Sequence, residues 1–120
     1  MAYAIGEVVA ERRIDAVAED GGRAPVVVRI GKPVPDTLPG GDWCCPHQIL
    51  GLGDEAVEAS FGVDSLQAFL LCVYSLRLKL GERAEAASVR LDWLGQAGLG
   101  LDVDPELYGS APPGGGRAAR

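Results

Sequence analysis

The sequence predicts an α+β domain, in which a mainly antiparallel β-sheet of four to five strands carries one long helix packed on one face. Residues 61–80 form the longest apolar segment and contain a clear helix start. Short alternating or β-branched segments, separated by Gly, Pro and Asp, precede it. A chain of 120 residues with 48% hydrophobic content also suits one compact core.

The first two strands are expected to form a hairpin. Apolar residues between Gly6 and Ala18 alternate with charged ones, and Arg12 interrupts the apolar face. Good helix formers in this segment also permit a helix. The turn residues at 19–22 and the β-branched segment at 25–31 favour the strand, because together they are typical of a hairpin.

Two further strands are predicted before the helix. Residues 32–41 contain three prolines and two glycines among ten residues, so we expect a loop there. Residues 43–50 read as a strand in which Pro46 marks an edge or a bulge. Residues 55–61 fit a strand, with a short helix as the alternative.

The long helix is predicted to begin at Ser65 and to run to residue 80. Asp64 is a helix-capping residue, and Gln67 stands three positions later, where its amide can reach back to the cap. Residues 81–87 are expected to be an exposed connection or an extra helical turn. The apolar residues at three-to-four-residue spacing are Leu66, Phe69, Leu70, Val73, Leu76 and Leu80.

The apolar arc of this helix is wider than one sheet can cover. Leu71, Tyr74 and Leu78 extend it and require a second partner. That partner is either residues 95–108 folding back or another copy of the chain. The second case predicts a homodimer through the back of the 65–80 helix.

The remaining residues complete a single domain. Alternating residues at 88–95 predict a last strand. We place the domain at 1–108 and expect the Pro/Gly-rich tail at 109–120 to be disordered.

Composition restricts the partners and the compartment. A net charge of −6 argues against nucleic acid, since phosphate binding needs clustered Lys and Arg. Three cysteines, two of them adjacent, suit a reducing compartment, and the N-terminus lacks the pattern of a signal peptide, so we expect a cytoplasmic protein. The 65–80 helix contains Arg77 and Lys79 and is too short to span a membrane.

Several motifs together resemble a known family. These are PVVVRIGKP, GDWCCPHQILGLGD, FGVDSLQAFLL and RLDWLG. They are similar to a family of small uncharacterised bacterial proteins, the domain of unknown function numbered 6968, over most of residues 7 to 101. The resemblance implies a bacterial origin and brings no activity, substrate or catalytic residue.

One group of residues has the side chains of a metal site. Asp42, Cys44, Cys45 and His47 are close in sequence, and Cys72 is a further thiol. Adjacent residues on a strand point to opposite faces, so Cys44 and Cys45 cannot share a tetrahedral site without backbone distortion. We therefore predict no metal and no cofactor, and we expect the cysteines to be small buried side chains.

Cys45 and His47 are the candidates for catalysis, because a thiolate beside an imidazole is a nucleophile. No third group is evident to orient the histidine. Trp43, Trp93 and Tyr74 are the aromatic candidates for a binding surface, although two strands that each carry one Trp more often contribute core.

These observations predict a non-enzymatic binding or interaction protein, immunity-like or accessory, whose partner is a protein that adds to the sheet edge or docks on the acidic face. The alternative is a small thiol-dependent enzyme or redox protein that uses Cys45 and His47.

Overall fold

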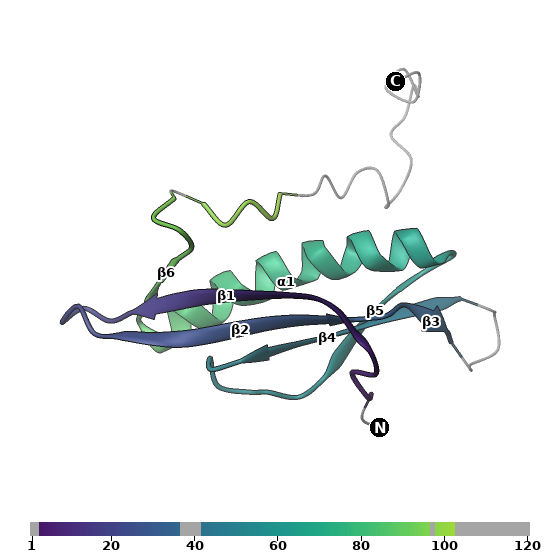
Figure 1. The fold of residues 1–120 in the computed structure, drawn as a ribbon, viewed down its shortest axis with the longest axis horizontal. Helices are drawn as coiled ribbons and strands as arrows, with labels where there is room; N and C mark the ends of the chain where they lie inside the picture. The colour runs from purple at the N-terminus through teal and green to yellow at the C-terminus, as the bar shows by residue number, and fades with distance from the viewer. Residues whose placement is uncertain (1–2, 37–41, 97, 103–120) are drawn as a thin grey trace, which may run out of the picture.

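The computed structural model describes residues 3–36, 42–96 and 98–102, and these form one helix on one face of a six-stranded antiparallel sheet (Figure 1). The predicted α+β fold is confirmed. The sheet has one strand more than the four to five expected, because a two-residue strand lies within the predicted loop at 32–41. The elements are β1 Val8–Val17, β2 Arg23–Gly31, β3 Val34–Pro35, β4 Trp43–Leu50, β5 Glu58–Gly62, α1 Ser65–Ala87 and β6 Arg90–Asp92.

The sheet is built around the hairpin of β1 and β2. β2 pairs with β4, β4 pairs with β5 on its other side, and β1 pairs with β6. The prediction of a strand rather than a helix at Gly6–Ala18 is therefore correct. The strand alternative at 55–61 is also correct, although β5 begins only at Glu58.

β3 continues the line of β2 along β4, after one extra residue. Ile30 pairs with His47, and Val34 pairs with Cys44. The β2–β3 segment therefore advances four residues where β4 advances three. Pro46 lies within this interval. The ladder on this side of β4 is interrupted at Pro46, because a proline lacks the N–H group that a regular ladder requires. The predicted loop at 32–41 thus contains a short strand, and its residues 37–41 lie outside the described chain.

The start of α1 follows the predicted pattern with one difference. Asp64 accepts a hydrogen bond from the backbone N–H of Gln67 at 2.7 Å. The Gln67 side chain reaches one residue beyond the cap and accepts from the N–H of Val63, also at 2.7 Å. Two backbone N–H groups at the helix start are thereby satisfied.

The predicted helix end at residue 80 is wrong, and the alternative of a helical continuation over 81–87 is correct, because α1 runs to Ala87. One exposed glycine, Gly81, costs about 1 kcal/mol in a helix interior, and the strong helix formers that follow it outweigh that cost. The helix ends where Val89 N–H donates to Ala84 O at 3.0 Å and Ser88 N–H donates to Glu85 O at 3.1 Å. Ser88 has a φ of 58°, in the position usually occupied by glycine.

The buried stripe of α1 also differs from the predicted face. Leu66 is 63% exposed, and Leu70 is only half-buried. The side chains closest to the sheet are mostly small, which lets the helix backbone approach β5. A Cβ atom on Gly62 would lie 2.5 Å from the Ala68 nitrogen. The buried positions are Ala68, Cys72, Leu76, Leu80 and Ala84.

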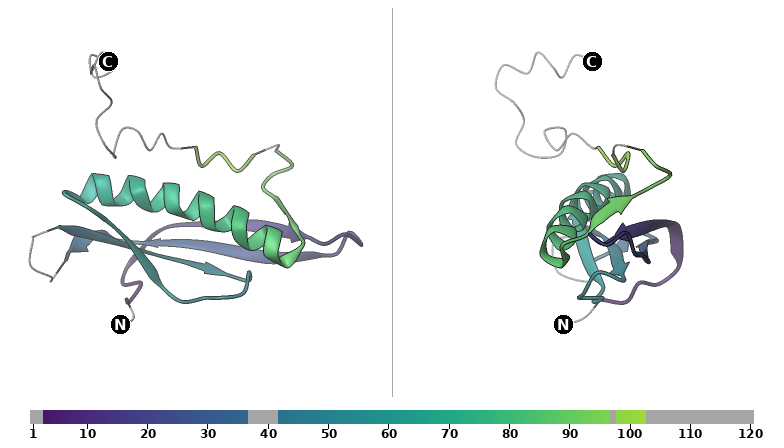
Figure 2. Two further views of the ribbon diagram at one scale, coloured as in Figure 1. Left: turned by 180° about the vertical axis from the view of Figure 1, so that it is seen from behind. Right: turned by 90° about the vertical axis from the view of Figure 1, so that its left-hand side faces the viewer.

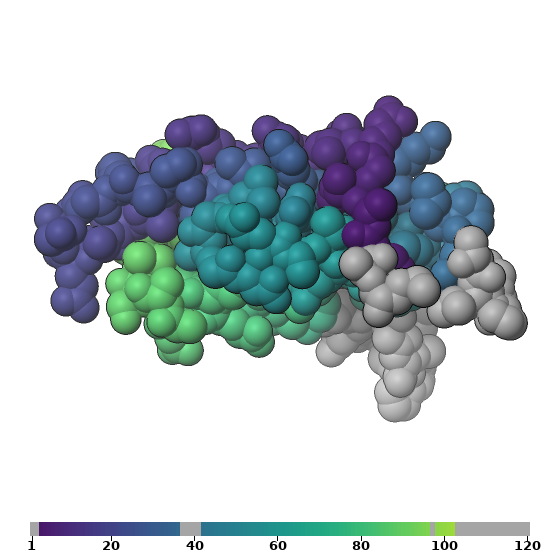
Figure 3. Space-filling view, turned by 90° about the horizontal axis from the view of Figure 1, so that it is seen from below, coloured from purple at the N-terminus to yellow at the C-terminus, as the bar shows by residue number. Residues whose placement is uncertain are grey.

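The opposite face of the sheet carries ion pairs and an N-terminal crossing. Arg29 pairs with Glu11 at 3.3 Å, as expected of a face turned to solvent. At one end, the N-terminal segment crosses the strands, and a Cβ atom on Gly31 would clash with Ile5 O at 2.0 Å. Figure 3 shows this purple segment lying across the blue and teal parts of the chain.

The segment after β6 leaves the sheet and runs along α1 (Figures 1 and 2). Leu99 and Leu101 pack against the core, so part of the predicted 95–108 segment does fold back on the helix layer. The predicted tail at 109–120 and the end of the domain at residue 108 lie outside the described residues. Within the described chain, no helix is long and apolar enough to cross a membrane.

Candidate functional site

The outer edge of β1 is largely unpaired. β2 pairs with β1 from Val8 to Val17, with a register shift between Val8 and Ala10. On the other side, β6 pairs only with residues 15–17. Across the described residues, no strand pairs with the outer side of β1 between Val8 and Ile14. An unpaired stretch of strand offers a row of backbone N–H and C=O groups to another chain.

A tight turn directs the chain away from this edge immediately after β6. Since Asp92 pairs with Asp15, an extended continuation would place Trp93 opposite Ile14 and the next residue opposite Arg13. Instead, Leu94 has a φ of 58° and Gly95 a φ of 70°. The N–H of Gln96 donates to Trp93 O at 3.1 Å, and two positive φ values inside such a hydrogen bond are typical of a type I′ turn. The predicted strand at 88–95 is therefore shortened to three residues.

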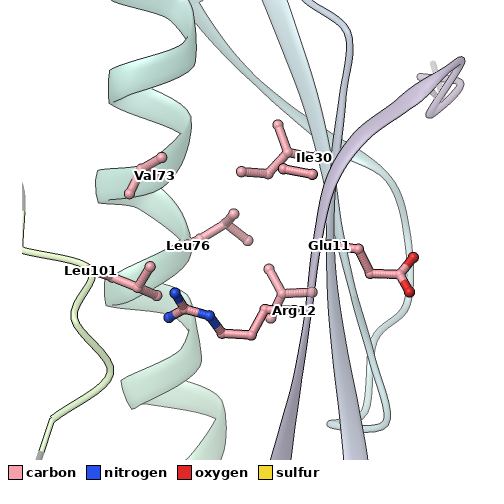
Figure 4. Close-up of a pocket in the computed structure, with 8 residues that line it drawn as sticks. Glu11, Arg12, Ile30, Val73, Leu76 and Leu101 are labelled. Atoms are coloured by element: carbon pink, nitrogen blue, oxygen red, sulfur yellow. The ribbon is translucent and has the colours of Figure 1, made fainter. Parts of the chain in front are cut away.

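Arg12 contacts the segment that follows β6. Its side chain is on the helix side of β1, where its guanidinium carbon lies 3.6 Å from the centre of the Trp93 ring. One of its N–H groups also donates to the backbone carbonyl of Leu99. In Figure 4 the Arg12 side chain points from β1 toward Leu101 and α1, whereas Glu11 points away on the other face. Arg12, which interrupts the apolar pattern of β1, is thus a cation that faces the helix at an open sheet edge.

A cavity of about 130 Å³ lies beside Arg12, between the sheet, the helix and the returning segment. Apart from Arg12 and Glu11, its walls are apolar. Because the Glu11 side chain points away, this residue contributes backbone to the wall, and the cavity therefore reaches the β1 main chain. The lining residues are Ala10, Glu11, Arg12, Val28, Ile30, Val73, Leu76 and Leu101.

The Arg12 guanidinium has no carboxylate partner among the residues that the structure describes. The cations on the outer face differ, since Arg23 and Arg29 each pair with carboxylates. A guanidinium has five N–H donors in a planar fork that matches a carboxylate. This edge therefore combines open backbone groups, an apolar cavity and a cation that retains donors.

The profile of a family described as "Domain of unknown function (DUF6968)" matches residues 10–103. The chain belongs to this family. The predicted resemblance is thereby confirmed, and the matched region of this DUF6968 protein contains Arg12, Trp93 and Leu99. Searches of curated proteins and of solved structures found no match.

The Cys45 and His47 side chains of the DUF6968 protein are inaccessible. They lie two residues apart on β4 and are 0% and 2% exposed. The ring nitrogen Nε2 of His47 lies 3.3 Å from the Ser60 hydroxyl. Burial is the main cause that lowers the pKa of His47; Glu58 opposes it, the positive charges of Lys79 and Arg83 add to it, and the resulting pKa is about 4. His47 is therefore a neutral, buried hydrogen-bonding residue.

The three thiols are free and buried. The hydrogen bond with Cys45 raises the pKa of Cys72, and burial acts in the same direction. The same bond lowers the pKa of Cys45, while burial opposes that change. Burial also raises the pKa of Cys44, which lies outside the cluster that faces α1. In the described chain, no three His, Cys, Asp or Glu side chains gather to hold a metal ion.

The other aromatic candidates lie away from the edge. Trp43 is half-buried at the start of β4 and packs against the core, as Trp93 does at the other end of the sheet. Tyr74 is half-buried on α1, where the Arg77 guanidinium lies 5.6 Å from its ring centre. Of the three predicted aromatic candidates, the structure therefore places Trp93 alone beside the open edge, where it holds Arg12.

Proposed function

We propose that this DUF6968 protein is a non-enzymatic protein-binding module that accepts an extended segment of its partner as an added strand along residues 8–14 of β1. The observation that carries this proposal is the unpaired outer side of β1. Strand addition is a common mode of recognition because main-chain hydrogen bonds provide affinity and alternate side chains provide specificity.

The local structure supports this use of the edge. A Leu in the left-handed region costs roughly 1 kcal/mol, and at Leu94 that conformation turns the chain off β1. The edge is also open next to a cavity rather than next to a continuous packed layer. Both features favour a binding role for β1 over a purely structural one.

The thiol-dependent alternative is less well supported. A substrate would have to reach Cys45 and His47, which are almost completely enclosed between β4 and α1. The neutral imidazole also lacks the charge that stabilises a thiolate at reactive cysteines. Three buried free thiols support a reducing compartment. We propose that this protein is an accessory or immunity-like protein of the bacterial cytoplasm.

The test uses a matched pair of proline variants. Ala10 and Glu11 are adjacent, so one backbone N–H points to β2 and the other to the open edge. Of Ala10→Pro and Glu11→Pro, the variant that keeps the wild-type circular dichroism spectrum and melting curve blocks the outer edge alone. Glu11→Gln retains the N–H group and serves as the control.

Wild type, the folded proline variant and Glu11→Gln are each used to capture proteins from a bacterial lysate of the source species. The proposal predicts a partner that wild type and Glu11→Gln retain and that the proline variant loses. It also predicts that amides within residues 8–14 become protected from hydrogen exchange in the purified complex. A partner that the proline variant holds as tightly as wild type would contradict binding at this edge.

A second proposal concerns the back of α1. Leu78 is 44% exposed on the side of this helix opposite its buried stripe, which supports self-association through its back. Sedimentation equilibrium of wild type and Leu78→Lys tests it. A wild-type dimer that Leu78→Lys converts to a monomer is the expected result, and a wild-type monomer at all concentrations would refute it.

A further inference from the structure

Resting on the proposed function, we further infer that the β1 edge selects strands with a particular side-chain pattern. The partner strand carries an acidic residue opposite Arg12 and, two positions later, a medium-sized apolar residue opposite Ala10.

The direction of the strand follows from the sheet. All described strand pairs are antiparallel, so we expect the added strand to run antiparallel to β1. Directly opposite residues in such a pair lie on the same face, with Cβ atoms about 5 Å apart. Ala10 and Arg12 face α1, and their two neighbours on the partner strand must face α1 as well. In an antiparallel strand the neighbour of Arg12 comes first, which gives the order acidic, any, apolar.

The apolar preference follows from the cavity. Ala10 has a small side chain, and beyond it lies the space of about 130 Å³ between the sheet, Val73 and Leu101. Apolar cavities of about 150 Å³ bind molecules the size of benzene. One Leu or Ile side chain entering beside Ala10 would fill much of this space, and a polar side chain would leave its hydrogen-bonding groups unsatisfied there.

The acidic preference follows from Arg12. Trp93 occupies one face of the guanidinium and Leu99 O accepts one of its N–H groups, so other donors in the plane remain for a partner. A carboxylate opposite Arg12 would accept charge-assisted hydrogen bonds from them. An apolar residue opposite Arg12 would leave the guanidinium buried without a charged partner. A basic residue in that position would repel it. Inward-facing charges on edge strands restrict pairing in this way.

The experiment uses capped peptides with threonine at alternate positions. The first peptide also carries one glutamate and, two residues later, one leucine. The matched peptides replace the glutamate by glutamine, replace the leucine by alanine, or exchange the two positions. Binding is followed by the amide shifts of ¹⁵N-labelled full-length protein. We expect the first peptide to shift amides between residues 8 and 14 and each matched peptide to bind weaker by on the order of tenfold or more.

Two protein variants show whether a change in peptide preference comes from the altered side chain or from a loss of structure in the protein. Ala10→Leu fills the cavity and should remove the preference for leucine over alanine while keeping the preference for glutamate. Arg12→Glu should reject the glutamate peptide and accept one with lysine in that position, a rescue that mere loosening of residues 93–102 cannot produce. Lysine peptides that bind Arg12→Glu no better than glutamate peptides would overturn the acidic preference.

The outcomes also separate this inference from the proposed function. If all the alternating peptides shift the β1 amides with equal affinity, the selection is refuted and the edge remains a docking site. If no peptide shifts these amides, both the selection and strand addition by peptides at this edge are contradicted.

Discussion

Acidification should destabilise this protein through His47. The imidazole is buried in the folded state, where its pKa is about 4, whereas an unfolded histidine has a pKa near 6.5. Between these two values the unfolded chain binds a proton that the folded chain does not, so the free energy of unfolding falls as the pH falls. The difference of about 2.5 pKa units corresponds to a loss of about 3 kcal/mol between pH 7 and pH 4.

The assay is urea unfolding followed by circular dichroism at pH 7, 6, 5 and 4, for wild type and for His47→Gln. Glutamine cannot be protonated and can still hydrogen-bond Ser60, so the variant retains the pH dependence of the carboxylates and lacks that of His47. We expect the stability of wild type to fall by about 3 kcal/mol more than that of the variant over this range. Parallel pH profiles, within about 0.5 kcal/mol, would refute a buried neutral His47.

Three further changes test the turns and the core, each by chemical or thermal unfolding. Leu94→Asn should stabilise by about 1 kcal/mol, because Asn-Gly suits two positive φ values and Leu94 is 75% exposed; a loss of stability would contradict the type I′ turn. Ser88→Gly should also stabilise by about 1 kcal/mol, as glycine adopts the left-handed cap without strain, and Ser88→Ala, which retains that strain, is its control. Leu80→Ala should cost about 3 kcal/mol and Leu66→Ala less than about 1 kcal/mol, because the first side chain is fully buried and the second is 63% exposed; equal costs would contradict the helix orientation.

Local patterns predicted much of the fold. The hairpin, the strand at 43–50 and the capped start of α1 each depend on neighbouring residues, and each is confirmed. At the end of α1 the helical alternative for 81–87 is the correct one, because the helix formers after Gly81 outweigh the cost of that glycine. The buried stripe was missed because apolar spacing does not tell a small side chain at a close contact from a large one beside it, and Ala68 and Cys72 lie at that contact.

The open edge could not be predicted from the sequence. Arg12 was visible as an interruption of the apolar face of β1, but its meaning depends on Trp93 and Leu99, which are distant in the chain. The shortening of β6 depends on a positive φ at Leu94, a residue type that rarely adopts it. Cys45 and His47 were singled out by their chemistry, and only the packing of α1 over β4 shows that they are enclosed.

Amide hydrogen exchange of the free protein tests the open edge of β1 most directly. Adjacent amides of a strand point to opposite sides, so an edge strand should show alternating protection. Between Ala10 and Ile14 we expect amides that face β2 to exchange slowly and amides that face outward to exchange at nearly the unprotected rate. Slow exchange at every amide in this stretch would mean that another segment already covers the edge, and it would contradict the proposed docking site.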